Sequence, residues 1–307
     1  MNALRWVQLA HRLAETWVRR PTTPSRVVMD LTRRCNLRCS MCHTWRIEPG
    51  HELDAAEIAE TLRQLPSLAW LDLTGGELFL RRDAVEVVRA VLGSTPALRV
   101  LHFPTNGWFT ERAVEAARLV RALRPEIELI VTVSIDGPPE LHDRIRGRTG
   151  AYARAAATFR ALRAIPSVKT YVGTTVTRDN VAALPSLLPR LAEDLPGFRA
   201  RDWHWNLLQI SRHFFDNEEL AGTAPPTGNL VSAHLRRRGL PRDLVELMEL
   251  IFLVNLEFYR RGEPSGIPCQ ALRSACFISP EGDVLPCHVY DRPVGNVRRQ
   301  RFDELWA

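Results

Sequence analysis

The stretch VVMDLTRRCNLRCSMCHTW, residues 27–45, joins a run typical of a buried β-strand to a loop with three cysteines. Cys35, Cys39 and Cys42 follow the strand-like run 27–32 almost at once. Three thiolates spaced in this way can hold one [4Fe–4S] cluster, each binding a different iron, so that the fourth iron keeps an open position. Zinc, with His43 as a fourth ligand, suits the spacing less well because zinc modules separate their cysteine pairs by a longer gap.

Outward from this loop, strand-like and helical runs alternate from residue 26 to about residue 210. The strand-like runs are 27–32, 70–75, 98–105, 127–135, 168–176 and 203–210. Amphipathic runs typical of helices lie at 55–65, 84–92, 111–123 and 152–165, and a longer one at 240–262. Such alternation predicts parallel strands covered by helices, and right-handed crossovers curl six such units into a partial barrel.

The cysteine spacing resembles the C-x3-C-x-aromatic-C motif of the radical S-adenosylmethionine (SAM) enzymes, with Met41 where an aromatic residue is usual. The resemblance implies that SAM chelates the open iron through its amino and carboxylate groups. It also implies that the reduced cluster cleaves SAM to methionine and a 5′-deoxyadenosyl radical. Cys35, Cys39 and Cys42 are then the catalytic ligands, and Met41 lies against the adenine, which its flexible apolar side chain suits.

Further motifs of this family follow successive predicted strands, at the rim where a barrel of parallel strands carries its active site. Gly75–Glu77 resembles the GGE motif that contacts the SAM ammonium. The stretch from Ser134 to Arg146 resembles SxDG…HD…R, which implies that these two residues hold the methionine carboxylate. The expected cofactor-binding residues are Met41, Gly75, Gly76, Glu77, Asn106, Ser134, Asp136, Arg146 and Asn180.

A second cysteine triplet, Cys269, Cys276 and Cys287, lies in the last part of the sequence. Residues 280–283, PEGD, predict the turn of a hairpin whose return arm carries Cys287. The string ISPEGDVLPC followed by GNV resembles the twitch or SPASM module of the same superfamily, which implies an auxiliary [4Fe–4S] cluster on these three cysteines. Either His288 supplies a fourth ligand or one iron is open to substrate; cysteines that bind zinc or nothing are the alternative.

The expected fold class is α/β, a partial (β/α)6 TIM-like barrel with a small C-terminal auxiliary iron–sulfur module. We expect four parts along the chain. They are an N-terminal helix over 1–25, a radical SAM partial barrel over 26–215, a loop and connecting helix over 216–262, and a twitch/SPASM-like module over 263–307.

Composition excludes several classes of protein. Hydrophobic residues at 45% and charged residues at 25% rule out a disordered, collagenous or membrane-spanning chain. The net charge of +6 comes almost wholly from dispersed arginines, so nucleic acid is not favoured as a partner. Without an export signal, a cytoplasmic location and free thiols are expected. Peripheral membrane contact by the basic amphipathic segment 1–25 is less favoured than packing on the protein.

The resemblance implies an enzyme whose 5′-deoxyadenosyl radical takes hydrogen from a substrate, which we expect to be a small molecule such as a sugar, nucleotide or lipid precursor. The 34 residues before Cys35 are too few for an independent leader-binding domain, so a peptide-modifying enzyme with a separate recognition protein is the alternative. An alternative from another class is a non-catalytic iron–sulfur electron-transfer protein. We expect flavodoxin or ferredoxin as reductant. The candidates for substrate contact or proton transfer are Trp45, Trp108, His204, Trp205, Asp136 and Asp143.

Overall fold

The computed structural model describes residues 21–223, 225, 227–264 and 266–306. Its strands form one sheet in the order β6-β5-β4-β3-β2-β1-β7-β8-β9, in which β1 to β6 and β7 are parallel. The barrel strands are β1 (Arg26–Asp30), β2 (Trp70–Thr74), β3 (Val100–Thr105), β4 (Glu128–Ser134), β5 (Val168–Val176) and β6 (Trp203–Leu207). All six predicted strands are confirmed to within a few residues.

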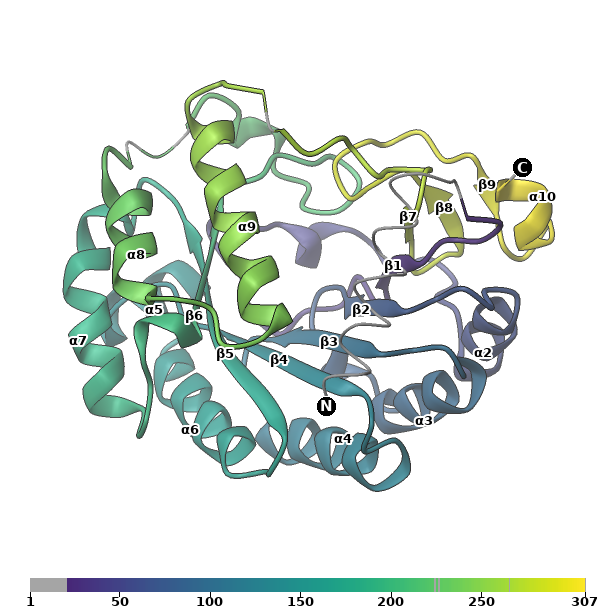
Figure 1. Cartoon of the computed structure of the whole chain (residues 1–307), viewed down its shortest axis with the longest axis horizontal. Helices are drawn as coiled ribbons and strands as arrows, with labels where there is room; N and C mark the ends of the chain where they lie inside the picture. Colours follow the sequence, from purple (N-terminus) through teal and green to yellow (C-terminus); the bar gives the residue numbers. More distant parts are fainter. Residues whose placement is uncertain (1–20, 224, 226, 265, 307) are drawn as a thin grey trace.

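Helices line the outer, convex side of the curved sheet (Figure 1). They are α2 (Ala55–Arg63), α3 (Ala84–Ser94), α4 (Thr110–Leu123), α5 (Pro139–Arg146), α6 (Ala151–Arg163) and α7 (Leu184–Asp194). The apolar faces of all but α5 join the outward side chains of the strands in one large core, while Leu141 and Ile145 of α5 pack against Leu37 and Met41. Short 3-10 helices lie at Thr44–Arg46, Leu78–Leu80, Val181–Ala183, Ala200–Asp202 and Glu218–Leu220. This arrangement confirms the expected partial barrel of α/β class.

Two further helices follow β6 in the chain. They are α8 (Leu230–Arg238) and α9 (Leu244–Arg260), and Figure 1 shows α9 crossing the concave side of the barrel strands. Val245 near the start of α9 is buried against Trp70 and Tyr171, which lie in the amino-terminal halves of β2 and β5. The helix therefore closes the amino-terminal end of the barrel and leaves the carboxyl ends of the strands open.

The last part of the chain extends the barrel sheet. It contains β7 (Ala275–Ile278), β8 (Asp283–Leu285), β9 (Gly295–Asn296) and α10 (Phe302–Trp306). Strand β7 pairs in parallel with β1, where Cys276 lies opposite Val27, and β8 returns antiparallel to β7. The predicted hairpin is thus present, and it is hydrogen-bonded to the first strand of the barrel. The division into four parts stays a prediction.

The expected N-terminal helix falls mostly on residues 1–20, which lie outside the described residues. Among the helices that the structure does describe, none is long and apolar enough to cross a membrane.

Candidate active site

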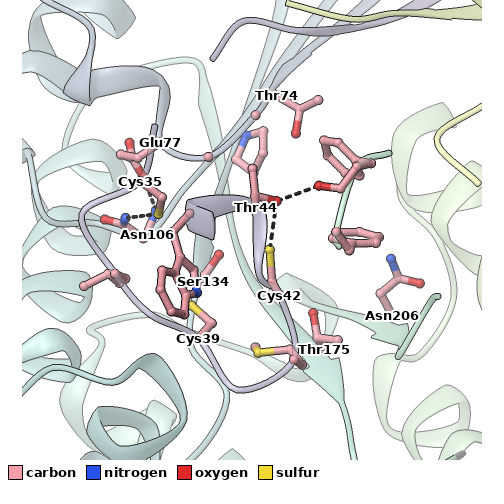
Figure 2. A pocket seen from close by; sticks show the side chains of 18 of the residues that line it. Cys35, Cys39, Cys42, Thr44, Thr74, Glu77, Asn106, Ser134, Thr175 and Asn206 are labelled. Atoms are coloured by element: carbon pink, nitrogen blue, oxygen red, sulfur yellow. Dashed lines mark hydrogen bonds between the residues drawn. The ribbon is translucent and has the colours of Figure 1, made fainter. Parts of the chain in front are cut away.

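The first cysteine triplet lies on the loop that follows β1. Leu37 and Met41, which alternate with the cysteines, are buried against Ile145 of α5. The backbone N–H of Ser40 donates to the carbonyl of Ile145 at 2.8 Å, so the loop is held by main chain as well as side chains. Cys35, Cys39 and Cys42 all line one cavity of about 330 Å³ at the open end of the barrel (Figure 2).

The three thiols are in a poor environment for ionisation. Burial raises the pKa of Cys35 to about 11 and that of Cys39 to about 12, and it also raises the pKa of Cys42. At Cys39 the Arg146 guanidinium opposes this effect, since its Nη1 donates to Sγ at 3.7 Å. Such thiols become thiolates only against a strong cation, as the irons of a cluster provide.

The donor set suits a cluster. Three thiols from one short loop line the cavity, and in a cubane cluster each cysteine binds a different iron. Three cysteines around one cavity therefore fit a [4Fe–4S] cluster with an open iron.

The glycines after β2 allow a close approach of two loops. Gly75 has a φ of +135°, in a region that residues with a Cβ rarely adopt. A Cβ on Gly76 would stand 2.3 Å from the carbonyl oxygen of Arg34, which belongs to the cysteine loop. Both glycines line the cavity. The sequence needs glycine here so that the backbone can pack directly against the cysteine loop.

Glu77 ties this loop to the end of β3. Its carboxylate accepts from the Thr105 hydroxyl at 2.9 Å and from the Asn106 backbone N–H at 2.7 Å. Burial raises its pKa to about 7. Asn106 in turn donates through Nδ2 to Asn36 Oδ1 at 2.9 Å and lies 4.0 Å from the Cys35 sulfur. Glu77 and Asn106 line the cavity, as Figure 2 shows, and their contact with SAM stays a prediction.

Ser134 and Arg146 form another part of the cavity wall. Both line the cavity, and Arg146 forms an ion pair with Asp136. The Arg146 Nε is buried and has no hydrogen-bond partner among the described residues. A buried guanidinium with an unused donor suits a carboxylate ligand. This wall therefore fits the anionic end of SAM, and the cavity has the size of a small-molecule site.

Two predicted cofactor residues, Asp136 and Asn180, do not line this cavity. Both are fully buried, and Asn180 donates through Nδ2 to the carbonyls of Asp136 and Thr175 at 2.9 Å each. Asp136 therefore helps to position the Arg146 side chain, and Asn180 holds the backbone of Asp136. Direct contact of either residue with SAM stays a prediction. Asp143 accepts from the backbone N–H groups of Gly150 and Tyr152 at the start of α6, so its carboxylate is already occupied.

A second cavity, of about 440 Å³, lies inside the barrel. We call it the chamber. Its floor is apolar, with Ile130 and Val245, and one side is formed by α9. The residues that line both the chamber and the cysteine cavity are Pro104, Ser134, Arg146, Thr175, Asn206, Gln209 and His288. The two cavities are therefore neighbours with a common wall.

Several chamber residues were not anticipated from the sequence. Arg26 pairs with Asp72 at 3.0 Å, and His102 bonds Asp72 through Nδ1 at 2.9 Å and Thr132 through Nε2 at 3.0 Å. Glu249 of α9 bonds His204. The signal that could have found Asp72 and His102 is a polar side chain at an inward position of an otherwise apolar strand.

The aromatic substrate candidates have different places. Trp45 lines the cysteine cavity, and His204 lines the chamber. Trp205 points the other way, since it is 3% exposed and stacks on His234 at 4.3 Å. Trp108 lines neither of the two cavities. Trp205 therefore belongs to the core, because successive strand residues face opposite sides.

The structure does not bring the second triplet together around one ion. Cys276 is buried on β7, where burial strongly raises its pKa, while Cys269 is exposed and Cys287 is partly exposed. His288, the candidate fourth ligand, bonds Gln209, and burial lowers its pKa to about 4. Their part as cluster ligands stays a prediction.

Comparisons with known proteins agree with this site. The Radical SAM superfamily model matches residues 29–187, and SPASM, an iron–sulfur cluster-binding domain, matches residues 269–307. An AdoMet-dependent heme synthase from Oleidesulfovibrio alaskensis is 28% identical, over 91% of this chain and 74% of its own length. A PqqA peptide cyclase from Gluconobacter oxydans is 28% identical, over 93% of this chain and 77% of its own.

Among solved structures, SuiB from Streptococcus suis bound to S-adenosylmethionine matches with a TM-score of 0.62 at 14% identity. The match covers 97% of this chain and 69% of SuiB, and it shows a common fold. The first family model spans more than half of this chain and includes the three cysteines of the loop after β1. The chain therefore belongs to the radical SAM superfamily and carries a C-terminal SPASM module.

Proposed function

We propose that this radical SAM enzyme acts on a small organic molecule held in the chamber. The observation that carries the proposal is the common wall between the chamber and the cysteine cavity. The chamber has a volume of about 440 Å³, and α9 closes it at the amino-terminal end of the barrel, so it suits a compact ligand. The AdoMet-dependent heme synthase among the relatives, by its name, makes a small molecule, which favours this class of substrate.

The family's cofactors are [4Fe–4S] clusters and SAM, which supply a 5′-deoxyadenosyl radical when bound and reduced. We assign the first cluster to Cys35, Cys39 and Cys42. Arg146 and Ser134 bind the methionine carboxylate, and Met41 borders the adenine. The buried side chains of Leu37 and Met41 would help to keep water from the cluster, as reactive intermediates require.

The SPASM module holds the auxiliary cluster, and Cys269, Cys276 and Cys287 are its proposed ligands. A flavodoxin or ferredoxin supplies electrons to the catalytic cluster. A cytoplasmic location fits these partners and the need for reduced thiols. Family membership favours an enzyme over the alternative of an electron-transfer protein.

A peptide substrate is the second candidate. The PqqA peptide cyclase is as similar in sequence as the heme synthase and is aligned over a similar share of this chain. On this alternative, one side chain of the peptide enters the chamber from the open end of the barrel while the backbone stays outside. A separate recognition protein then presents the peptide.

Anaerobic reconstitution tests the proposed function. With dithionite and SAM, the enzyme is expected to release 5′-deoxyadenosine even without substrate, and SAM is expected to perturb the paramagnetic spectrum of the reduced cluster. Clusters that neither respond to SAM nor cleave it would contradict the enzyme assignment. Release that increases with a small-molecule panel, and not with peptides, would support the first candidate over the second.

A further inference from the structure

His204 has a distinctive setting in the chamber wall. It lies on β6, where His204 and Asn206 face the chamber while Trp203 and Trp205 face the core. Its Nδ1 is 2.9 Å from each carboxylate oxygen of Glu249, which comes from α9. The ring of Phe252, one turn further along α9, lies against the imidazole at 5.2 Å between centroids. Two side chains of one helix thus hold this imidazole in place.

The surroundings of Glu249 favour its charged form. Burial by itself would raise the pKa of Glu249. The interactions of its carboxylate with His204 and Arg238 are stronger than this effect, so the pKa of Glu249 is lowered. Arg238 of α8 lies 3.8 Å from the Glu249 carboxylate. An ionised Glu249 accepts a hydrogen bond from Nδ1–H, which leaves Nε2 as the nitrogen that can exchange a proton with a ligand. Within the described residues, Nε2 has no hydrogen-bond partner.

A second histidine of the chamber provides a contrast. His102 uses Nδ1 on Asp72 and Nε2 on the Thr132 hydroxyl, so both of its nitrogens are occupied. In His204, by contrast, Nε2 is free to accept a hydrogen bond from a ligand. The chamber that His204 lines shares a wall with the cysteine cavity. In the sheet, Gly173 is the register partner of both Ser134 and His204, and Ser134 belongs to the common wall. The unused acceptor therefore lies near the place where substrate meets cofactor.

We propose that His204 accepts a hydrogen bond, and then a proton, from a hydroxyl or amino group of the substrate. The inference rests on the proposed function, because it takes the chamber as the substrate site. In the step, the substrate's O–H or N–H bond breaks and an Nε2–H bond forms. Both electrons of the broken bond stay on the substrate, so the step needs no oxidant. Glu249 stabilises the resulting imidazolium through Nδ1–H.

This assignment narrows the substrate class. An Nε2 acceptor favours a ligand with a hydroxyl or amino group beside the reacting carbon. The chamber's two carboxylates, Asp72 and Glu249, already have cationic or imidazole partners. At the His204 side, the chamber is therefore suited to an alcohol or an amine.

The experiment uses the reconstituted enzyme with SAM and diethyl pyrocarbonate, which acylates unprotonated imidazole nitrogens. Peptide mapping by mass spectrometry follows each histidine, and exposed His51 reports the reagent's activity. We expect His204 to be acylated in the wild type, while His102, with both nitrogens occupied, reacts at least about tenfold more slowly. A wild-type enzyme in which His51 reacts and His204 does not would overturn the proposal.

Two variants test the part of Glu249. Glu249→Leu removes both the orientation and the charge, so the acylation rate of His204 is expected to fall at least about threefold. Glu249→Gln keeps an acceptor for Nδ1–H but loses the charge, so it should restore only part of that rate. Equal rates in all three proteins would overturn the proposal.

A final readout separates this inference from the proposed function. Release of 5′-deoxyadenosine by the wild type in the absence of substrate reports on the cysteine cavity, which His204 does not line. Release that fails in the wild type counts against the proposed function, whatever His204 does. Release that is normal in a wild-type enzyme whose His204 resists acylation counts against the inference alone.

Discussion

Arg33 of the cysteine loop forms an ion pair with Glu281 in the turn between β7 and β8, with 3.4 Å between Nη2 and Oε2. Arg33 also pairs with Asp30 at 3.0 Å and donates to the carbonyl of His213 at 2.7 Å. The Arg33 side chain is only 7% exposed. The loop that carries the catalytic cysteines is therefore fastened directly to the SPASM module.

Replacing either end of this ion pair should have unequal effects. Arg33→Met leaves the fully buried Asp30 without its cation, and we expect the free energy of unfolding to fall by about 3 kcal/mol. Glu281→Gln should cost about 1 kcal/mol or less, because this carboxylate is partly exposed. Urea unfolding of the anaerobic protein measures both, and equal losses would contradict the assigned geometry.

Gly76→Ala should disturb the cysteine loop. The added methyl group meets the Arg34 carbonyl, and we expect a loss of about 1–3 kcal/mol of stability together with reduced iron loading. Gly93→Ala in α3 is the matched control, since a Cβ there meets no atom within 4 Å. The control should gain about 0.5–1 kcal/mol from helix propensity. Iron analysis and thermal unfolding distinguish the two, and normal loading in Gly76→Ala would refute the close contact.

Glu77 should make stability depend on pH. Its pKa is about 7 in the folded chain against 4.5 for the free group, so the native state keeps a proton that the unfolded state releases. The contribution is present in full below about pH 4.5, and it is lost as pH rises to about 7, on the order of 3 kcal/mol in the free energy of unfolding. Asp30, whose pKa is also about 7, adds a separate loss of the same sign.

Glu77→Gln should therefore flatten this pH dependence without abolishing it. Denaturant unfolding at a series of pH values between 4.5 and 8 measures the slope in both proteins. A slope as steep as that of the wild type would show that Glu77 does not hold its proton in the folded state.

Variants of the two cysteine triplets should differ in which product they still form. Alanine in place of Cys35, Cys39 or Cys42 should abolish the formation of 5′-deoxyadenosine, because the catalytic cluster needs all three cysteine ligands. Alanine in place of Cys269, Cys276 or Cys287 should spare cleavage of SAM while the substrate product is lost. Chromatography of both products checks this, with circular dichroism as the control for folding since clusters stabilise the chain. Equal loss of 5′-deoxyadenosine from both sets would contradict the division.

Much of the barrel could be predicted because its signals are local. Each strand shows as a short apolar run, and Cys35, Cys39 and Cys42 lie within eight residues of one another. Motifs after successive strands were expected to meet at one rim, and Glu77, Asn106 and Ser134 do line one cavity. Parallel strands guarantee this meeting, since their carboxyl ends share an edge.

The remainder depends on contacts between distant segments. Glu249 reaches His204 only because α9 folds back across the barrel, and no pattern within the helix 240–262 indicates which glutamate faces inward. Asp136 and Asn180 have residue types suited to a ligand, but whether they face the cavity or brace it depends on side-chain packing. The pairing of β7 with β1 joins segments 249 residues apart, as the bond from Ser25 to Ser274 shows.

That pairing also determines when the barrel can be finished during synthesis. Strand β1 is made early, and one of its two hydrogen-bonding edges stays open until β7 has left the ribosome. An open edge of a central strand invites pairing with other chains. Protein made without β7 would keep this edge exposed, so aggregation of shortened chains follows from the same ladder that joins the module to the barrel.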